Sequence, residues 1–205
     1  MKHHVFTKRS KIEAPIAELF RWHARPGAIE RLSPPWDPLQ IISSSGGIEE
    51  GAEVRLRLKM GPVPYHWRAR HTKFVENALF RDESVSGPFS RWIHTHRFTS
   101  AGDDACYLQD EIDFKLPLHP FRNSLSNRFV HKKLERIFNY RHIRTAQDIA
   151  QQLSVPNRYP RNILISGASG VIGSALIPFL TTAGHRVISL RRDVVRNRDT
   201  ERIWD

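Results

Sequence analysis

The stretch Val54-Arg-Leu-Arg-Leu-Lys-Met60 alternates apolar and basic side chains without interruption. Successive side chains of a strand point to opposite faces, so this alternation puts the apolar residues on one face and the charges on the other. Gly61-Pro62 follows directly and is typical of a turn. The stretch therefore predicts a β-strand with one buried and one solvated face.

Further strand-like runs lie on both sides of this stretch, separated by short turn sequences. Two short helices are expected before the second strand, one starting at Pro15 and one over residues 28–32, which must end before Pro34. Strands joined by short turns pair antiparallel, so the pattern predicts an antiparallel sheet. The runs are residues 5–13, 40–44, 65–75, 79–85, 92–98 and 107–116.

A long helix is predicted after the last of these strands, because the apolar spacing changes there to a helical period of about 3.6 residues. We expect it to run from about residue 121 to beyond residue 141. Residues 148–153 either continue the helix or form a separate turn. The apolar residues that carry the new period are Val130, Leu134, Ile137 and Phe138.

Residues 154–161 contain two prolines and no apolar period, which is typical of a linker between domains. The sequence therefore predicts a first domain over residues 1–153 and a second unit over residues 162–205. The second unit reads as a strand at 162–166, a glycine-rich turn, a helix at 174–183 and a strand at 186–190. This order is that of a βαβ unit.

The turn of the second unit contains a spaced set of glycines, Gly167, Gly170 and Gly173, between an apolar strand and a helix. In dinucleotide-binding proteins the first glycine permits the tight turn, the second lets the backbone approach a pyrophosphate, and the third allows close helix–strand packing. The amides of the helix N-terminus then face the phosphates. The alternative is a structural glycine turn that binds no nucleotide.

The end of the second strand bears on the choice of cofactor. An acidic residue there is typical of NAD, whereas Arg191 and Arg192 suit the 2′-phosphate of NADP. We therefore expect NADP, while Asp193 keeps NAD as the less favoured alternative. The predicted cofactor-binding residues are Gly167, Ser169, Gly170, Val171, Ile172, Gly173, Arg191 and Arg192.

Two segments of this unit, residues 166–173 and 184–192, resemble the opening of the NAD(P)-dependent epimerase/dehydratase family of extended or atypical short-chain dehydrogenases. The Trp204-Asp205 pair is also similar to that family. The resemblance implies a Rossmann domain whose catalytic Tyr-x-x-x-Lys pair lies far downstream of the glycines. It therefore predicts an N-terminal fragment of a longer oxidoreductase, with an incomplete Rossmann domain, no catalytic residue and no activity on its own.

The first domain resembles START-like proteins, the polyketide cyclase and lipid-transfer superfamily, through residues 31–36, 87–92 and 138–142. The resemblance implies an α+β helix-grip fold, in which a long C-terminal helix lies across a curved antiparallel sheet. It also implies an apolar ligand cavity between the two. Candidate wall residues, any of which may instead fill the core, are Trp67, Trp92, Phe98, Phe114, Phe129 and Phe138.

His94 and His96 share a strand face with Trp92 and Phe98 by their even spacing, and Asp110 shares a face with Phe114. If that face points inward, a histidine with a carboxylate can act as an acid–base pair, but a hydrogen-bonded structural pair or exposed histidines are the commoner arrangements. The His-x-His spacing is also compatible with half of a metal site, but without a clear third ligand this signal is weak, and no metal ligand is assigned. The predicted ligand pocket consists of Trp67, Trp92, His94, His96, Phe98, Asp110 and Phe114.

The composition of the 205 residues, 40% hydrophobic and 26% charged, is that of a globular protein. The net charge of +11 is spread along the chain instead of forming blocks, which argues against a nucleic-acid partner. No apolar run reaches the roughly 18 residues of a membrane span. The single cysteine, Cys106, and the lack of a visible signal sequence predict a cytoplasmic protein.

Two functions remain open at this point. The first is the N-terminal part of an NADP-dependent epimerase/dehydratase-like oxidoreductase, whose START-like domain binds a small hydrophobic ligand. The second is a non-catalytic hydrophobic-ligand or lipid-binding module with a regulatory nucleotide-binding domain. Both imply a small-molecule partner, and neither fixes the substrate, the reaction direction or the oligomeric state.

Overall fold

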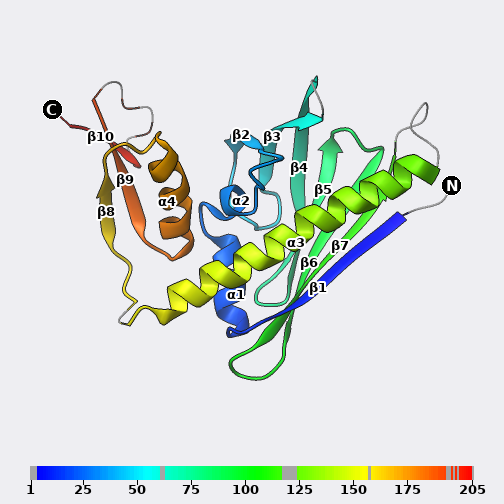
Figure 1. Ribbon diagram of the computed structural model, residues 1–205, viewed down its shortest axis with the longest axis horizontal. Coiled ribbons are helices and arrows are strands. Elements are labelled where there is room, and N and C mark those ends of the chain that lie inside the picture. Colours follow the sequence, from blue (N-terminus) through cyan, green and yellow to red (C-terminus); the bar gives the residue numbers. More distant parts are fainter. Residues whose placement is uncertain are drawn as a thin grey trace.

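The computed structural model describes residues 4–60, 63–116, 124–156, 158–192, 195, 197 and 199–204. A large antiparallel sheet crossed by a long helix makes up most of the chain, and a small parallel sheet with one helix follows it (Figure 1). The first part consists of β1 (His4–Ile12), α1 (Ile16–Ala24), α2 (Ala28–Arg31), β2 (Gln40–Ser44), β3 (Glu53–Met60), β4 (Val63–Val75), β5 (Leu79–Ser86), β6 (Arg91–Ser100), β7 (Cys106–Lys115) and α3 (Ser124–Ser154).

The large sheet has seven strands in the order β1-β7-β6-β5-β4-β3-β2, and every neighbouring pair is antiparallel. Consecutive strands from β2 to β7 are neighbours, as short turns require, whereas β1 returns to pair with the last strand. This arrangement confirms the predicted antiparallel sheet and, with α3 across it, the helix-grip fold.

Helix α3 lies diagonally over one face of the sheet (Figure 1). It runs without a break to Ser154, so residues 148–153 continue the helix. Burial alternates strictly along β7, which gives that strand one face under α3 and one face toward solvent. Leu134, Phe138 and Ile149 are the helix residues that enter the apolar core.

The second unit consists of β8 (Asn162–Ile165), α4 (Val171–Thr182), β9 (Arg186–Arg191) and β10 (Glu201–Ile203). Its strands are parallel and lie in the order β10-β9-β8. Helix α4 begins at Val171, so the predicted start at residue 174 is wrong. The reason is that Gly170 is already the N-cap, and its carbonyl accepts from the Ser174 amide at 2.9 Å.

The two units contact each other through α2 and the C-terminal half of α4. Gly27 has a φ of +93°, and a Cβ there would lie 2.4 Å from Thr181 Oγ1. Arg25 donates to the Thr182 carbonyl at 2.9 Å, and Gln152 donates to the Thr182 hydroxyl at 3.1 Å. Close backbone approach at a glycine therefore defines this interface.

An ion pair on the α3 side supports the same interface. Arg31 donates to both carboxylate oxygens of Asp148, at 2.6 and 2.5 Å. The Arg31 guanidinium also lies over the ring of Phe179, 5.5 Å from its centre. Among the described residues, none forms a helix long and apolar enough to cross a bilayer.

Candidate functional site

The middle of the covered sheet face is polar. Strand pairing places His96 beside Asp110 and His94 beside Ile112 across β6 and β7. Along the strands, these two cross-strand pairs are followed on either side by a pair of apolar residues. In order along the two strands, the four cross-strand pairs are Phe98–Leu108, His96–Asp110, His94–Ile112 and Trp92–Phe114.

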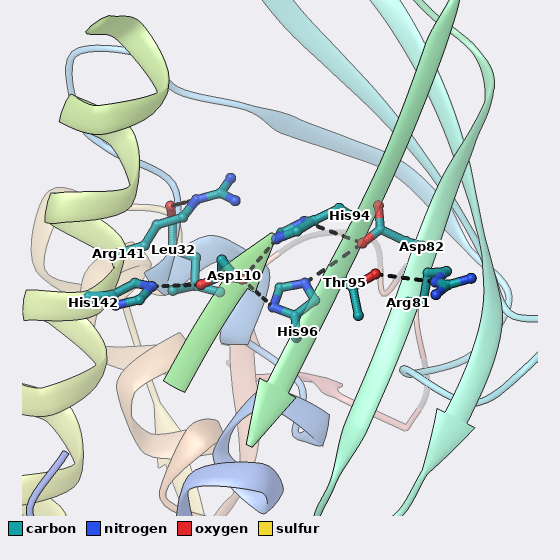
Figure 2. A network of polar contacts seen from close by, with 9 residues as sticks. All are labelled: Leu32, Arg81, Asp82, His94, Thr95, His96, Asp110, Arg141 and His142. Carbon is teal, nitrogen blue, oxygen red and sulfur yellow. Dashed lines mark hydrogen bonds and ion pairs between the residues drawn. The ribbon is translucent and has the colours of Figure 1, made fainter. Parts of the chain in front are cut away.

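Asp110 lies at the centre of a group of imidazoles (Figure 2). Its Oδ1 accepts from His94 Nε2 at 2.8 Å and lies 2.7 Å from His96 Nδ1. Its Oδ2 accepts from His142 Nε2 at 2.6 Å, and His142 Nδ1 lies 2.8 Å from the Ser10 hydroxyl. We call Asp110, His94, His96 and His142 the Asp110 cluster; it links β6 and β7 to α3.

The charges of this cluster are set by burial and by mutual attraction. Burial alone would raise the pKa of the Asp110 carboxyl, but the His96 charge and the hydrogen bonds from the three histidines hold that pKa well below its usual range. Burial alone would lower the pKa of His96, but the Asp110 and Asp82 carboxylates raise it to about 9. Burial and the His96 charge lower the pKa of His94. At neutral pH Asp110 is therefore ionised and His96 is the protonated imidazole, so the two form a buried ion pair.

Asp82 on β5 approaches the same imidazoles from the opposite side (Figure 2). Its Oδ2 lies 3.4 Å from His94 Nδ1 and 3.7 Å from His96 Nε2. The Asp82 side chain is 18% exposed, whereas those of His94 and Asp110 are almost fully buried. His94 and His96 therefore lie between two carboxylates, and Asp82 is the one that solvent reaches.

His23 on α1 gives a prediction for pH dependence. Its Nδ1 lies 2.9 Å from the Leu19 carbonyl, and burial and the His96 charge lower its pKa to about 4. The unfolded chain binds this proton at a pKa of about 6.5, so below that pH the unfolded state is favoured. We expect His23 to remove about 3 kcal/mol from the free energy of unfolding between pH 6.5 and pH 4.

Urea denaturation at several pH values measures this effect by comparison with His23→Gln, which cannot titrate. The difference in the free energy of unfolding between the protein and this variant should stay constant above pH 6.5. As the pH falls below 6.5, the protein should lose stability relative to the variant. A difference that does not change between pH 6.5 and pH 4 contradicts the prediction.

The aromatic residues expected to line a ligand cavity pack against each other. Phe114 is fully buried, and Trp92 and Phe98 are buried in two separate apolar clusters. Trp67 contacts Trp92 edge to face, with ring centres 4.8 Å apart. Phe129 is 65% exposed, so its prediction as a wall residue is wrong. The helical period placed Phe129 on α3 but did not fix which side of the helix faces the sheet.

Three residues of this site were not predicted from the sequence. Asp82 follows Phe80 by two residues, so the period of β5 contained the signal that both point inward. His142 lies one helical turn after Phe138 and therefore shares its buried face. His23 lies four residues after Leu19 on α1, next to the buried Trp22.

The glycine turn of the second unit bends back on itself. Gly167 has a φ of +69°, and its carbonyl accepts from the Gly170 amide at 2.9 Å. A Cβ at Gly173 would lie 2.4 Å from the Gly167 carbonyl oxygen, so only glycine fits there. Val171 and Ile172 are 90% and 80% exposed at the helix N-terminus, as is Ser169 just before it. The pocket at this bend, of about 490 Å³, is lined by Ile165, Ser166, Gly167, Gly170, Val171, Ile172, Gly173 and Leu176.

The two predicted phosphate-binding arginines lie at the end of β9. Arg191 donates to Glu201 on β10 at 3.0 Å, and Arg192 is exposed. Strands β8 and β9 are parallel, so their carboxyl ends lie at the same edge of the sheet. The glycine turn after β8 and the arginines at the end of β9 therefore lie along one edge.

A long helix across an antiparallel sheet of this order, with a polar cluster between them, defines a helix-grip protein of the START-like class. Residues 12–138 match the family described as polyketide cyclase / dehydrase and lipid transport. The chain belongs to this family. No curated protein matches the chain.

Solved structures extend the comparison. A nucleoside-diphosphate sugar epimerase from Corynebacterium glutamicum aligns over 98% of this chain with a TM-score of 0.77 and 26% identity. The chain spans 41% of that protein's length. The Zhui aromatase/cyclase from Streptomyces aligns over 76% of this chain and 99% of its own, with 11% identity and a TM-score of 0.62. A START superfamily protein from Mycobacterium smegmatis aligns over 72% of this chain and 98% of its own, with 15% identity and a TM-score of 0.56. The last two likenesses concern the fold alone.

Proposed function

We propose that this chain joins a START-like domain, which binds a small hydrophobic molecule, to the first part of an NADP-binding Rossmann domain in an epimerase/dehydratase-like oxidoreductase. The observation that carries the proposal is the bend at Gly167–Gly173, where a Cβ at Gly173 would fill the space that the loop backbone occupies. Such a bend brings backbone amides and a helix N-terminus to one point, as dinucleotide sites require.

Two further observations support the nucleotide assignment. The order β10-β9-β8 corresponds to strands 3-2-1 in one half of a doubly wound dinucleotide-binding sheet. The epimerase from C. glutamicum also aligns over the helix-grip part and the parallel unit together. The same pairing of domains in a protein named as an epimerase favours this function over a lipid-binding module with a merely regulatory nucleotide domain.

The residues of the bend fit the pyrophosphate of NADP. The unpaired amides of the first turn of α4 would donate to its oxygens, and Arg191 and Arg192 would bind the 2′-phosphate through charged hydrogen bonds. Bound NADP would supply a hydride acceptor or donor. This chain would bind and orient the cofactor, and none of its residues is assigned to proton transfer.

Titration of the full-length protein with NADPH, followed by NADPH fluorescence, tests this function. We expect NADPH to bind at least about tenfold more tightly than NADH, because one additional charged hydrogen bond accounts for such a factor. Gly173→Val should weaken binding by at least about tenfold, since it displaces the loop backbone.

Ala175→Val is the matched control, because it puts the same β-branched residue on the exposed side of α4, two residues further along. It introduces the same β-branched side chain into α4 without touching the bend. Failure of NADPH to bind, or equal binding by Gly173→Val, contradicts the cofactor assignment.

The ligand of the START-like domain is the second part of the proposal. Trp67, Phe89, Trp92 and Phe114 form a continuous aromatic group at one end of the covered sheet face. The Trp67 indole nitrogen is buried there without a hydrogen-bond partner, which leaves one polar anchor open to a ligand. Native mass spectrometry of the full-length protein should detect a co-purified apolar molecule, and Trp67→Phe should reduce its occupancy.

A further inference from the structure

Two imidazole nitrogens and one carboxylate oxygen converge on the side of the Asp110 cluster that faces Asp82. An ionised carboxylate only accepts hydrogen bonds, so the nitrogens in contact with Asp110 carry the hydrogens, namely His94 Nε2 and His96 Nδ1. The opposite nitrogen of neutral His94 then has a lone pair, and the opposite nitrogen of His96 gains one when a metal ion displaces its second proton. The opposite nitrogens are His94 Nδ1 and His96 Nε2, and Asp82 Oδ2 lies close to both.

The distances from Asp82 to the two imidazole nitrogens are close to those between two ligands of one metal ion. Asp82 Oδ2 lies 3.4 Å from His94 Nδ1 and 3.7 Å from His96 Nε2, and the three atoms all lie within 4.8 Å of one another. Nitrogen and oxygen ligands bind zinc at about 2.0–2.2 Å, so two ligands of a tetrahedral ion stand roughly 3.4 Å apart. Asp82 Oδ2 therefore already lies at about the ligand–ligand spacing from each imidazole nitrogen, and the two nitrogens lie within 4.8 Å of each other.

We propose that Asp82, His94 and His96 form a binding site for a divalent transition-metal ion such as Zn²⁺. Two imidazoles and one carboxylate are a common donor set for this class of ion, and they leave a fourth position for water or substrate. Asp82 is the ligand that solvent reaches, so an ion would enter from its side.

The surroundings of the three ligands match those of metal sites. Metal-binding histidines commonly donate their other ring N–H to a carboxylate, which fixes the ring and strengthens the ligand. Asp110 Oδ1 accepts in this way from His94 and contacts His96, and Asp110 Oδ2 is hydrogen-bonded to His142. Asp110 is therefore a positioning residue for both imidazoles.

A further nitrogen lies in the same row of the sheet. His71 on β4 pairs with Asp82 across β4 and β5, which puts both side chains on one face. His71 is 9% exposed, and its Nδ1 is buried without a hydrogen-bond partner. His71 is therefore a fourth buried imidazole next to Asp82 in the sheet, and one of its ring nitrogens has no hydrogen-bond partner among the described residues.

The test uses full-length protein without a histidine tag, treated with EDTA and then titrated with Co²⁺, whose visible bands report tetrahedral coordination. We expect one equivalent to bind, and Zn²⁺ to displace it. Asp82→Ala should weaken binding on the order of 100-fold or more, and Asp110→Asn by about 10–100-fold, the usual range for a residue that supports a ligand. NADPH binding is measured separately and should not change in either variant.

Glu83→Gln is the matched control, because Glu83 is the next residue on β5 and its carboxylate bonds Thr72 on the other face. Circular dichroism confirms the fold of each variant, and Asp82→Asn, which keeps the side-chain shape, replaces Asp82→Ala if the alanine variant unfolds. If the protein binds no Co²⁺ stoichiometrically, or if both Asp82 variants bind it as tightly as Glu83→Gln does, the proposal is overturned. The ion pairs of protonated His96 with Asp82 and Asp110 then account for this group of side chains.

Discussion

Asp110→Ala is expected to lower the free energy of unfolding by about 3–5 kcal/mol, the largest effect of any single substitution considered for this protein. The substitution removes the acceptor of three imidazoles and leaves the positive charge of His96 buried without its strongest partner. Removing one partner of a buried ion pair destabilises the fold by more than the intact pair stabilises it, because the remaining charge stays buried without a partner.

Urea denaturation of the metal-free protein at pH 7 measures this loss. Asp110→Asn keeps the shape and one acceptor oxygen, so it should fall between the alanine variant and the unchanged protein. Asp103→Ala removes an exposed carboxylate from the turn between β6 and β7 and should change stability by no more than about 0.5 kcal/mol. An Asp110→Ala variant as stable as Asp103→Ala contradicts the central role of Asp110.

Gly27→Ala is expected to separate the START-like part from the parallel unit. A Cβ at Gly27 would lie 2.4 Å from Thr181 Oγ1 and 2.7 Å from the Pro178 Cα, and backbone cannot move away as a flexible side chain can. The positive φ of 93° adds strain of about 1–2 kcal/mol for any L side chain. Overpacking adds about 1–3 kcal/mol, so the total is about 2–5 kcal/mol.

Gly51→Ala separates these two contributions, because Gly51 has nearly the same φ of 90° and open space around its missing Cβ. It should show the strain alone. Trypsin cleavage at Arg158 and Arg161, between α3 and β8, measures the separation of the two units. We expect faster cleavage in Gly27→Ala only, and equal rates in the two variants would show that the interface does not depend on Gly27.

Much of the secondary structure could be predicted from the sequence, because it follows from local periods. The alternation that starts at Val54 predicted a strand, and its described side chains alternate between buried or half-buried and exposed from Val54 to Leu58. The helical spacing from Val130 to Phe138 predicted α3. The ends of helices and strands could be predicted less closely than their positions, because a single residue decides where a helix is capped. Helix α4 starts at Val171 because Gly170 caps it, and β10 was not predicted because three residues carry too short a pattern.

The sequence by itself determined that His94 and His96 share one strand face and that Asp110 shares a face with Phe114, since side chains alternate with a period of two. Only the tertiary structure decided that His96 lies beside Asp110, that Asp82 closes the group from β5, and that His142 reaches it from α3. Strand register and the rotation of a helix over a sheet depend on packing between segments far apart in the chain. Local periods do not contain that information, so the meeting of these five side chains is a property of the folded molecule.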